Sequence, residues 1–104
     1  MDSCYTICMK PILFLLDLEI LEELATRSDF RYGKEIAKDG AVTLLKKNVF
    51  NLLATVEHKN SRPQTAELNS TAKGLRWKCT CTSRKGLFCE HCVALSIVAG
   101  GLDI

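Results

Sequence analysis

The stretch Cys79-Thr-Cys-Thr-Ser-Arg-Lys-Gly-Leu-Phe-Cys-Glu-His91 places three cysteines and one histidine within thirteen residues. The four side chains form two pairs, Cys79 with Cys81 and Cys89 with His91, in the pattern C-x-C-x7-C-x-H. Structural zinc sites take four tetrahedral ligands from thiolate sulfur and imidazole nitrogen, and two pairs from separate segments are the usual way to supply them. The spacing therefore predicts one Zn²⁺ ion bound by these four side chains.

The residues around these pairs predict a strand before them and a helix after them. Residues 75–78 alternate apolar and basic, as a half-exposed strand does, so Cys79 and Cys81 are expected to point to one face. Residues 82–86 favour a turn, and residues 93–99 form an apolar run long enough for a buried helix. The ion would thus fix a corner between a strand and a helix, which we call the zinc knuckle.

Cys92 leaves the fourth ligand open on spacing alone. Cys89-Glu-His-Cys92 also reads as C-x-x-C, and an all-cysteine zinc site is chemically reasonable. The same pair at a helix start is a possible thiol-redox motif, although such a motif has no need of a second cysteine pair ten residues earlier. If His91 is the ligand, Cys92 is expected to be a small packed residue or a neighbour of the site.

No catalytic residues are predicted. A catalytic zinc ion keeps one coordination position open, whereas four protein ligands close the shell, and the His-x-Glu signature of the zinc deaminases is missing. We therefore expect a module that binds a partner, not an enzyme, and no small-molecule substrate.

The two ligand pairs followed by an Ala-Leu helix resemble the SWIM zinc finger family; the matching residues are Cys79, Cys81, Cys89, His91, Ala94 and Leu95. The resemblance extends upstream through the pattern Phe30-x-x-Gly33-x-x-Ile36-x-x-x-Gly40-x-Val42, which is similar to the short helix and first strand before the finger in many bacterial members. It covers residues 29–99, whereas residues 1–28 match nothing familiar.

This resemblance implies a zinc-stabilised binding module with nucleic acid or protein as its partner, and it favours His91 over Cys92 as the fourth ligand. Members of the family commonly occur inside larger proteins such as helicase-related ATPases and transposases. An accessory subunit of a larger DNA-processing complex is therefore an alternative expectation.

The rest of the chain predicts an α+β fold of N-terminal helices, a small antiparallel β-meander, the zinc knuckle and a C-terminal helix. One amphipathic helix is expected from Pro11 to near Thr26, with an apolar stripe formed by Leu13, Leu16, Ile20, Leu21 and Leu24. A second helix, capped by Ser28 or Asp29, is expected to run to about Lys38 and to stop at Gly40. Strands are expected near residues 41–45, 49–56, 65–69 and 75–79. Residues 1–28 would form a leader and residues 29–104 the zinc-binding domain.

The composition of the 104 residues, 47% hydrophobic and 25% charged, is that of one small globular domain, for which a metal ion is a sensible staple. Acidic residues from position 17 onward interrupt the apolar run at 11–16 well before the ~20 residues that a membrane span needs.

Six cysteines without a plausible secretory signal indicate reduced thiols and a cytoplasmic location, or a nuclear one in a eukaryote. Cys4 and Cys8 are expected to be free thiols, and His58 a solvated loop residue without a partner.

The charges are unevenly distributed along the chain. Residues 1–30 hold two basic and six acidic residues, whereas residues 31–104 hold twelve basic and six acidic ones. Strand alternation should turn Trp77 inward and basic side chains outward, and the predicted phosphate-contacting surface consists of Arg76, Lys78, Arg84 and Lys85. The favoured partner is therefore nucleic acid; the rival is a protein docked on the Leu-rich segment Ile12–Ala25.

Overall fold

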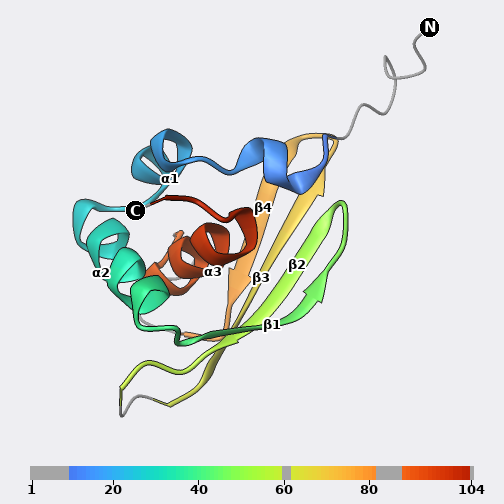
Figure 1. The fold of residues 1–104 in the computed structure, drawn as a ribbon. Coiled ribbons are helices and arrows are strands. Elements are labelled where there is room, and N and C mark those ends of the chain that lie inside the picture. The colour runs from blue at the N-terminus through green and yellow to red at the C-terminus, as the bar shows by residue number, and fades with distance from the viewer. Residues whose placement is uncertain (1–9, 60–61, 82–87, 104) are drawn as a thin grey trace, which may run out of the picture.

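The computed structural model describes residues 10–59, 62–81 and 88–103 (Figure 1). Its elements in chain order are η1 (Ile12–Leu15), α1 (Leu18–Leu24), α2 (Arg27–Lys38), β1 (Val42–Lys47), β2 (Asn51–Val56), β3 (Gln64–Thr71), β4 (Gly74–Cys79) and α3 (Glu90–Gly100). The predicted α+β class is confirmed, as are an antiparallel meander and a helix after the Cys/His pairs.

The four strands form one antiparallel sheet in the order β1-β2-β3-β4, so each strand pairs with its neighbours in sequence. The register aligns Leu53 with Glu67 and Glu67 with Lys78, and a bulge in β1 between Leu44 and Lys46 brings Lys46 opposite Leu53. All the helices lie on one side of the sheet (Figure 1). The side chains turned away from them form what we call the outer face: Thr43, Lys46, Asn51, Leu53, Thr55, Thr65, Glu67, Asn69, Arg76 and Lys78.

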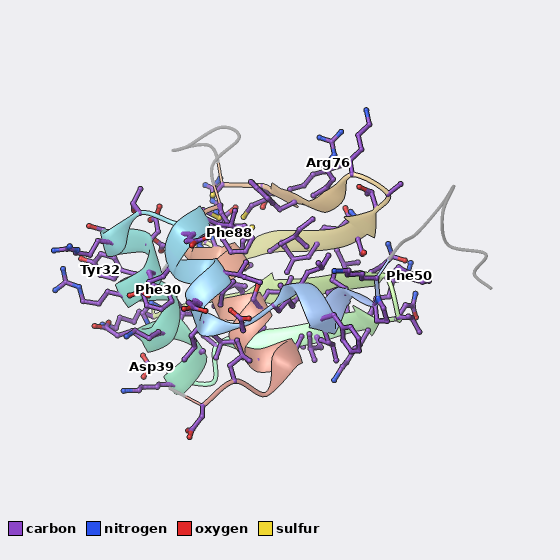
Figure 2. All side chains as sticks on the ribbon, turned by 90° about the horizontal axis from the view of Figure 1, so that it is seen from above. Phe30, Tyr32, Asp39, Phe50, Arg76 and Phe88 are labelled. Carbon is purple, nitrogen blue, oxygen red and sulfur yellow. The ribbon has the colours of Figure 1, made fainter. Side chains whose placement is uncertain are left out.

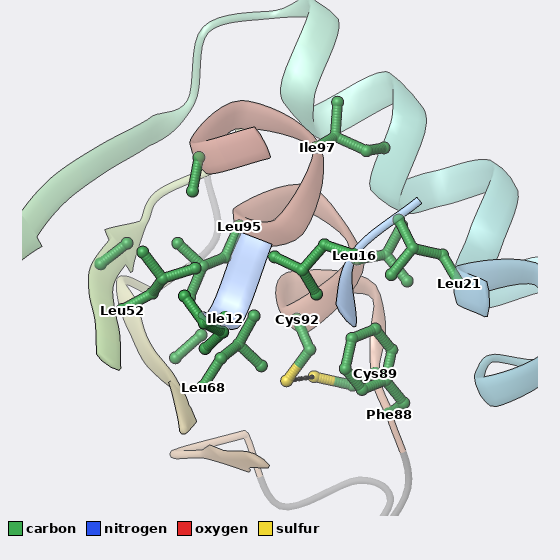
Figure 3. Close-up of a cluster of buried hydrophobic side chains, with 14 residues drawn as sticks. Ile12, Leu16, Leu21, Leu52, Leu68, Phe88, Cys89, Cys92, Leu95 and Ile97 are labelled. Atoms are coloured by element: carbon green, nitrogen blue, oxygen red, sulfur yellow. Dashed lines mark hydrogen bonds between the residues drawn. The ribbon is translucent and has the colours of Figure 1, made fainter. Parts of the chain in front are cut away.

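Helix α3 lies in the middle of the fold, between the inner face of the sheet and α2. Its residues have no polar face, which is typical of a helix that is buried all round. Leu95 packs with Leu52 and Leu68 of the sheet and with Ile12 of η1 in one hydrophobic cluster (Figure 3). The segment before α2 therefore shares its core with the sheet and α3.

Helix α2 approaches α3 closely because Gly33 has no side chain. A Cβ atom at Gly33 would lie 3.0 Å from the carbonyl oxygen of Glu90 and closer still to the side chain of Val93. Gly40 ends α2 with a positive φ of 70°, as the sequence predicts for a helix stop.

The single helix predicted from Pro11 to Thr26 is wrong. The chain forms η1 first, turns extended at Leu16, and starts α1 after Asp17, whose carboxylate accepts a hydrogen bond from the Ile20 amide (2.8 Å). Asp17 favours a helix N-cap over a helix interior, and that local bond outweighs the continuous apolar stripe. The cap of α2 is also earlier than predicted by two residues or more: Thr26 Oγ1 accepts the amide hydrogen of Asp29, so neither Ser28 nor Asp29 is the cap.

The expectation that His58 has no partner is wrong as well. His58 Nε2 lies 2.9 Å from Asp39 Oδ2, and the histidine side chain is largely buried. The pair joins the loop after β2 to the end of α2. In the described ranges, the helices are all too short or too polar to cross a membrane.

Candidate metal centre

The cluster of three cysteines and one histidine forms where the end of β4 meets the start of α3. Cys79 is the last residue of β4, Cys81 follows two residues later, Cys89 is the N-cap of α3 and His91 is in its first turn. One ligand atom from each of the four lies within 4.8 Å of all the others. These residues could hold a metal ion.

Hydrogen bonds to β3 fix the direction of the C-x-C pair. The Thr80 amide donates to the Thr65 carbonyl (3.0 Å), and the Thr65 amide donates to Thr80 Oγ1 (2.9 Å). Thr80 Oγ1 also donates to Gln64 Oε1 (2.6 Å). Because Thr80 is exposed and held to β3, its neighbours Cys79 and Cys81 turn to the opposite side, where α3 begins.

Aromatic packing and the α2 contact fix the α3 side of the cluster. The ring of Phe88, next to Cys89, meets the ring of Trp77 edge to face with centroids 5.1 Å apart. The Val93 amide donates to the Cys89 carbonyl (3.0 Å), which starts the helix at the cysteine. Gly33 lets α2 pack directly on this first turn, so the ligands are held by residues from three elements.

The distances within the cluster match a tetrahedral site. His91 Nδ1 lies 3.5 Å from Cys79 Sγ and 3.7 Å from Cys89 Sγ. With metal bonds of about 2.3 Å to sulfur and 2.05 Å to nitrogen, tetrahedral angles separate the two donor atoms by about 3.6 Å. His91 Nε2 points away from the sulfurs and lies 3.9 Å from Glu90 Oε2, a carboxylate that can orient the ring.

The pKa values of all four candidate ligands are shifted from their usual ranges. Hydrogen bonds from Cys79 and Cys92 lower the pKa of Cys89 far below its usual range. The hydrogen bond with Cys89, together with burial, raises the pKa of Cys79, and burial raises that of Cys81. Burial opposes protonation of His91, but the hydrogen bond with Cys89 and its negative charge outweigh that effect and raise the pKa of His91. These directions leave Cys89 as the thiolate of the cluster and keep protons on the other thiols, and a divalent cation that binds there would displace those protons.

Cys92 lies beside the cluster but is not one of its four members. Its side chain is fully buried, and a hydrogen bond joins its sulfur to that of Cys89 at 3.9 Å (Figure 3). The hydrogen bond with Cys89 and burial raise the pKa of the Cys92 thiol. Cys92 is thus a packed neighbour of the candidate ligands, as expected if the histidine completes the set.

The basic residues predicted to contact phosphate are only partly described. Arg76 and Lys78 are exposed on the outer face, and Figure 2 shows Arg76 extending away from the body of the molecule. Trp77 between them turns inward, as predicted. Arg84 and Lys85 lie outside the described residues, as do Cys4 and Cys8.

Sequence reasoning missed three residues that shape this region. Lys46 joins Lys78 in one cross-strand row because of the bulge in β1, Gly33 admits the first turn of α3, and Glu90 faces the histidine ring. Gly33 is part of the upstream pattern quoted above. The row that contains Lys46 and Lys78 depends on the pairing of four strands, so no local sequence signal reveals it.

No family model, no curated protein and no solved structure matches this chain.

Proposed function

We propose that this protein is a zinc-stabilised module that binds nucleic acid through the outer face of its sheet. The observation that supports the proposed zinc site is the cluster of four donor atoms within 4.8 Å of one another. Three thiolates and one imidazole are a donor set that favours zinc over the harder cations, which prefer oxygen.

The role proposed for the ion is structural. Cys79 and Cys81 belong to the sheet side and Cys89 and His91 to the central helix, so one ion would tie the two layers together. A shell closed by four protein ligands leaves no position for a reacting water. We therefore propose no catalytic activity.

The proposal that the protein binds nucleic acid is based on the position and charge of the outer face. Arg76 and Lys78 stand on the edge strand β4, and Lys46 stands on β1 in the same row as Lys78. Glu67 is the acidic member of this face, so basic side chains exceed acidic ones by three to one. In the helical layer on the other side of the sheet, exposed acidic residues outnumber exposed basic ones: Asp17, Glu19, Glu22, Glu23, Glu35 and Asp39 against Arg27, Arg31 and Lys38. This distribution of charge favours a polyanion on the sheet side.

The chemistry of the outer face favours contacts with the phosphate backbone. None of its ten residues, all within the described ranges, is aromatic, and Trp77 is turned into the core. Proteins that hold single strands generally stack bases on aromatic side chains, whereas lysine and arginine contacts to phosphate carry no sequence information. Binding is expected to be largely independent of sequence and to involve duplex backbone.

Charge reversal tests the nucleic-acid proposal. The metal-loaded protein would be titrated with fluorescent single- and double-stranded oligonucleotides at two salt concentrations. The variant R76E/K78E should bind more weakly, and each lost phosphate contact should lower the slope of log affinity against log salt by about 0.9 on duplex DNA. The matched control is R31E/K38E, which makes the same change in net charge at exposed positions of α2.

If both variants lower the affinity for oligonucleotides equally, the effect comes from net charge alone. That result would contradict binding at the outer face. No binding by the parent protein at either salt concentration would end the nucleic-acid proposal. Metal content, measured by native mass spectrometry on the same samples, tests the zinc proposal separately.

A protein partner is the second candidate, and one observation favours it. Most of the Leu-rich segment is committed to the protein's own core, but Leu13 and Phe14 of η1 are 41% and 74% exposed. The Ile12 amide donates to the Val49 carbonyl (2.7 Å), so this helix lies beside the β1–β2 turn, where Val49 is also exposed. Such an apolar interface should be insensitive to salt, and the double variant Leu13→Ser with Phe14→Ser should abolish self-association or partner binding without changing the metal content.

A further inference from the structure

The first turn of α3 holds two thiols in contact, of which the proposed metal site uses one. Cys89 is a candidate ligand, whereas Cys92 is not among the four clustered residues. Their sulfur atoms are 3.9 Å apart, and both side chains are almost completely buried (Figure 3). Hydrophobic packing alone does not require a second cysteine at this position.

We propose that Cys89 and Cys92 form a redox-modification site, at which a hydroperoxide converts the pair to a disulfide and the bound metal ion is released. The release of metal rests on the zinc site proposed above, whereas formation of the disulfide does not.

The backbone already holds the two cysteines at a spacing that suits a disulfide. Cys89 is the N-cap of α3 and Cys92 its third residue, so they face each other across one helical turn. The sulfur atoms need to approach from 3.9 Å to about 2.05 Å, and rotation of the two side chains brings them closer. Cys79 and Cys81 also lie within 4.8 Å of Cys89, but they come from the end of β4 and not from the same helical turn.

The reaction balances with one peroxide. The Cys89 thiolate attacks a peroxide oxygen, the O–O bond breaks, and Cys89 becomes a sulfenic acid as hydroxide leaves. The Cys92 thiol then attacks Cys89 Sγ, the S–O bond breaks, and water leaves with the Cys92 proton. In total, one thiolate, one thiol and H₂O₂ give one disulfide, one water and one hydroxide, and the two electrons lost by the sulfurs reduce the peroxide.

Cys92 determines which product forms while metal is bound. The other candidate thiolates are engaged by the ion in that state, so among the described residues Cys92 is the free thiol in contact with an oxidised Cys89. A resolving thiol at this distance captures a sulfenic acid before further, irreversible oxidation. Once the disulfide forms, Cys89 can no longer act as a thiolate ligand, and three donors remain.

The sequence provides a direct way to map the disulfide. Trypsin cleaves after Lys78, Arg84 and Lys85, so Cys79 and Cys81 fall in the peptide 79–84, while Cys89 and Cys92 fall together in the peptide 86–104. Native mass spectrometry of the untreated full chain first establishes whether zinc is bound. The chain is then treated with graded H₂O₂, released zinc is followed with a chromophoric chelator, and the alkylated digest is analysed by mass.

We expect the peptide 86–104 to lose two hydrogens in step with zinc release, and dithiothreitol with added zinc to restore the starting state. In Cys92→Ala the metal should still bind, but peroxide should release it several-fold more slowly, and the oxidation should no longer be reversed by dithiothreitol. Cys92→Ser is the second variant, in case the alanine disturbs packing.

A disulfide that links the peptides 79–84 and 86–104 in the parent protein would overturn the inference, as would equal rates of zinc release in the parent and both variants. Absence of zinc in the untreated protein would instead contradict the proposed metal site, and the digest alone would then decide whether Cys89 pairs with Cys92.

Discussion

The helical segments are attached to the two ends of the sheet by different interactions. At one end η1 is attached through the buried side chain of Ile12, the bond from its amide to Val49, and a bond from Ser70 Oγ to the Lys10 carbonyl (2.6 Å). At the other end the strand β4 meets α3 through a cluster of thiols and one imidazole. The first end is held by contacts within the chain, whereas the second brings together four donor groups, some of which hold protons that a metal ion would displace. The difference predicts that metal removal acts first at the second end, and that loss of a core contact of η1 acts first at the other.

Removal of the metal should have the largest effect on stability. It should act first at the end of the sheet where β4 meets α3, which we call the metal end. Zinc contributes roughly 10–16 kcal/mol in small structural sites, which exceeds the usual stability of a domain of this size. With a chelator, hydrogen exchange should accelerate throughout α3 and β4. Equal protection of α3 with and without metal would contradict a structural role for the ion.

Acidification should weaken the metal end steeply. The raised pKa values of Cys79 and Cys81 mean that both carry protons near neutral pH, and metal binding must displace them. The logarithm of the affinity should therefore rise with pH with a slope on the order of two, and the raised pKa of His91 adds to the loss of affinity on the acid side. Cobalt absorbance followed across pH gives the slope. A flat profile near neutral pH would mean that the ligands are already deprotonated.

Ile12→Ala should damage the other end and leave the metal site intact. The side chain is fully buried in the main core, so its loss should cost about 2–5 kcal/mol in the free energy of unfolding. Leu13→Ala is the matched control, because its side chain is 41% exposed and its loss should cost only about 0.5 kcal/mol. Urea unfolding gives both values, and the affinity for cobalt should be unchanged in each variant.

Gly33→Ala should affect the candidate metal site although Gly33 is not one of its four members. The added methyl group meets Val93 and the Glu90 carbonyl, so the first turn of α3 must shift, at a cost of about 1–3 kcal/mol. In contrast to Ile12→Ala, this variant should also lower metal affinity. Gly100→Ala is the control, since the new Cβ meets only the flexible Leu102 side chain, at 3.3 Å. Unchanged metal affinity in Gly33→Ala would show that the ligands do not depend on the α2 contact.

The smallest effect is expected at the pair His58 and Asp39. The carboxylate is 54% exposed, so the coupling between the two side chains should be about 0–1 kcal/mol. A double-mutant cycle with His58→Ala and Asp39→Asn measures it. A coupling well above this range would make the loop after β2 a third anchor of the fold.

The extent to which the sequence predicted this structure depends on the distance over which each signal acts. The strand, the Cys/His pairs and α3 follow from spacings within a few residues, and all three are present. The single N-terminal helix failed because the stripe of leucines is also compatible with two short helices, and the choice depends on the cap at Asp17. The contact of His58 with Asp39 spans nineteen residues, and the row of Lys46 with Lys78 requires the complete register of the sheet. Neither leaves a local pattern.

The central position of α3 also bears on how the protein is made. This helix follows all the other helices and strands of the described residues, yet it supplies the surface on which the sheet, η1 and α2 all pack. While a ribosome is still translating residues 90–100, the earlier elements have no helix against which to bury their inner faces. We therefore expect the nascent chain to expose Leu52 and Leu68 until α3 emerges, and folding to follow synthesis of this helix instead of accompanying it.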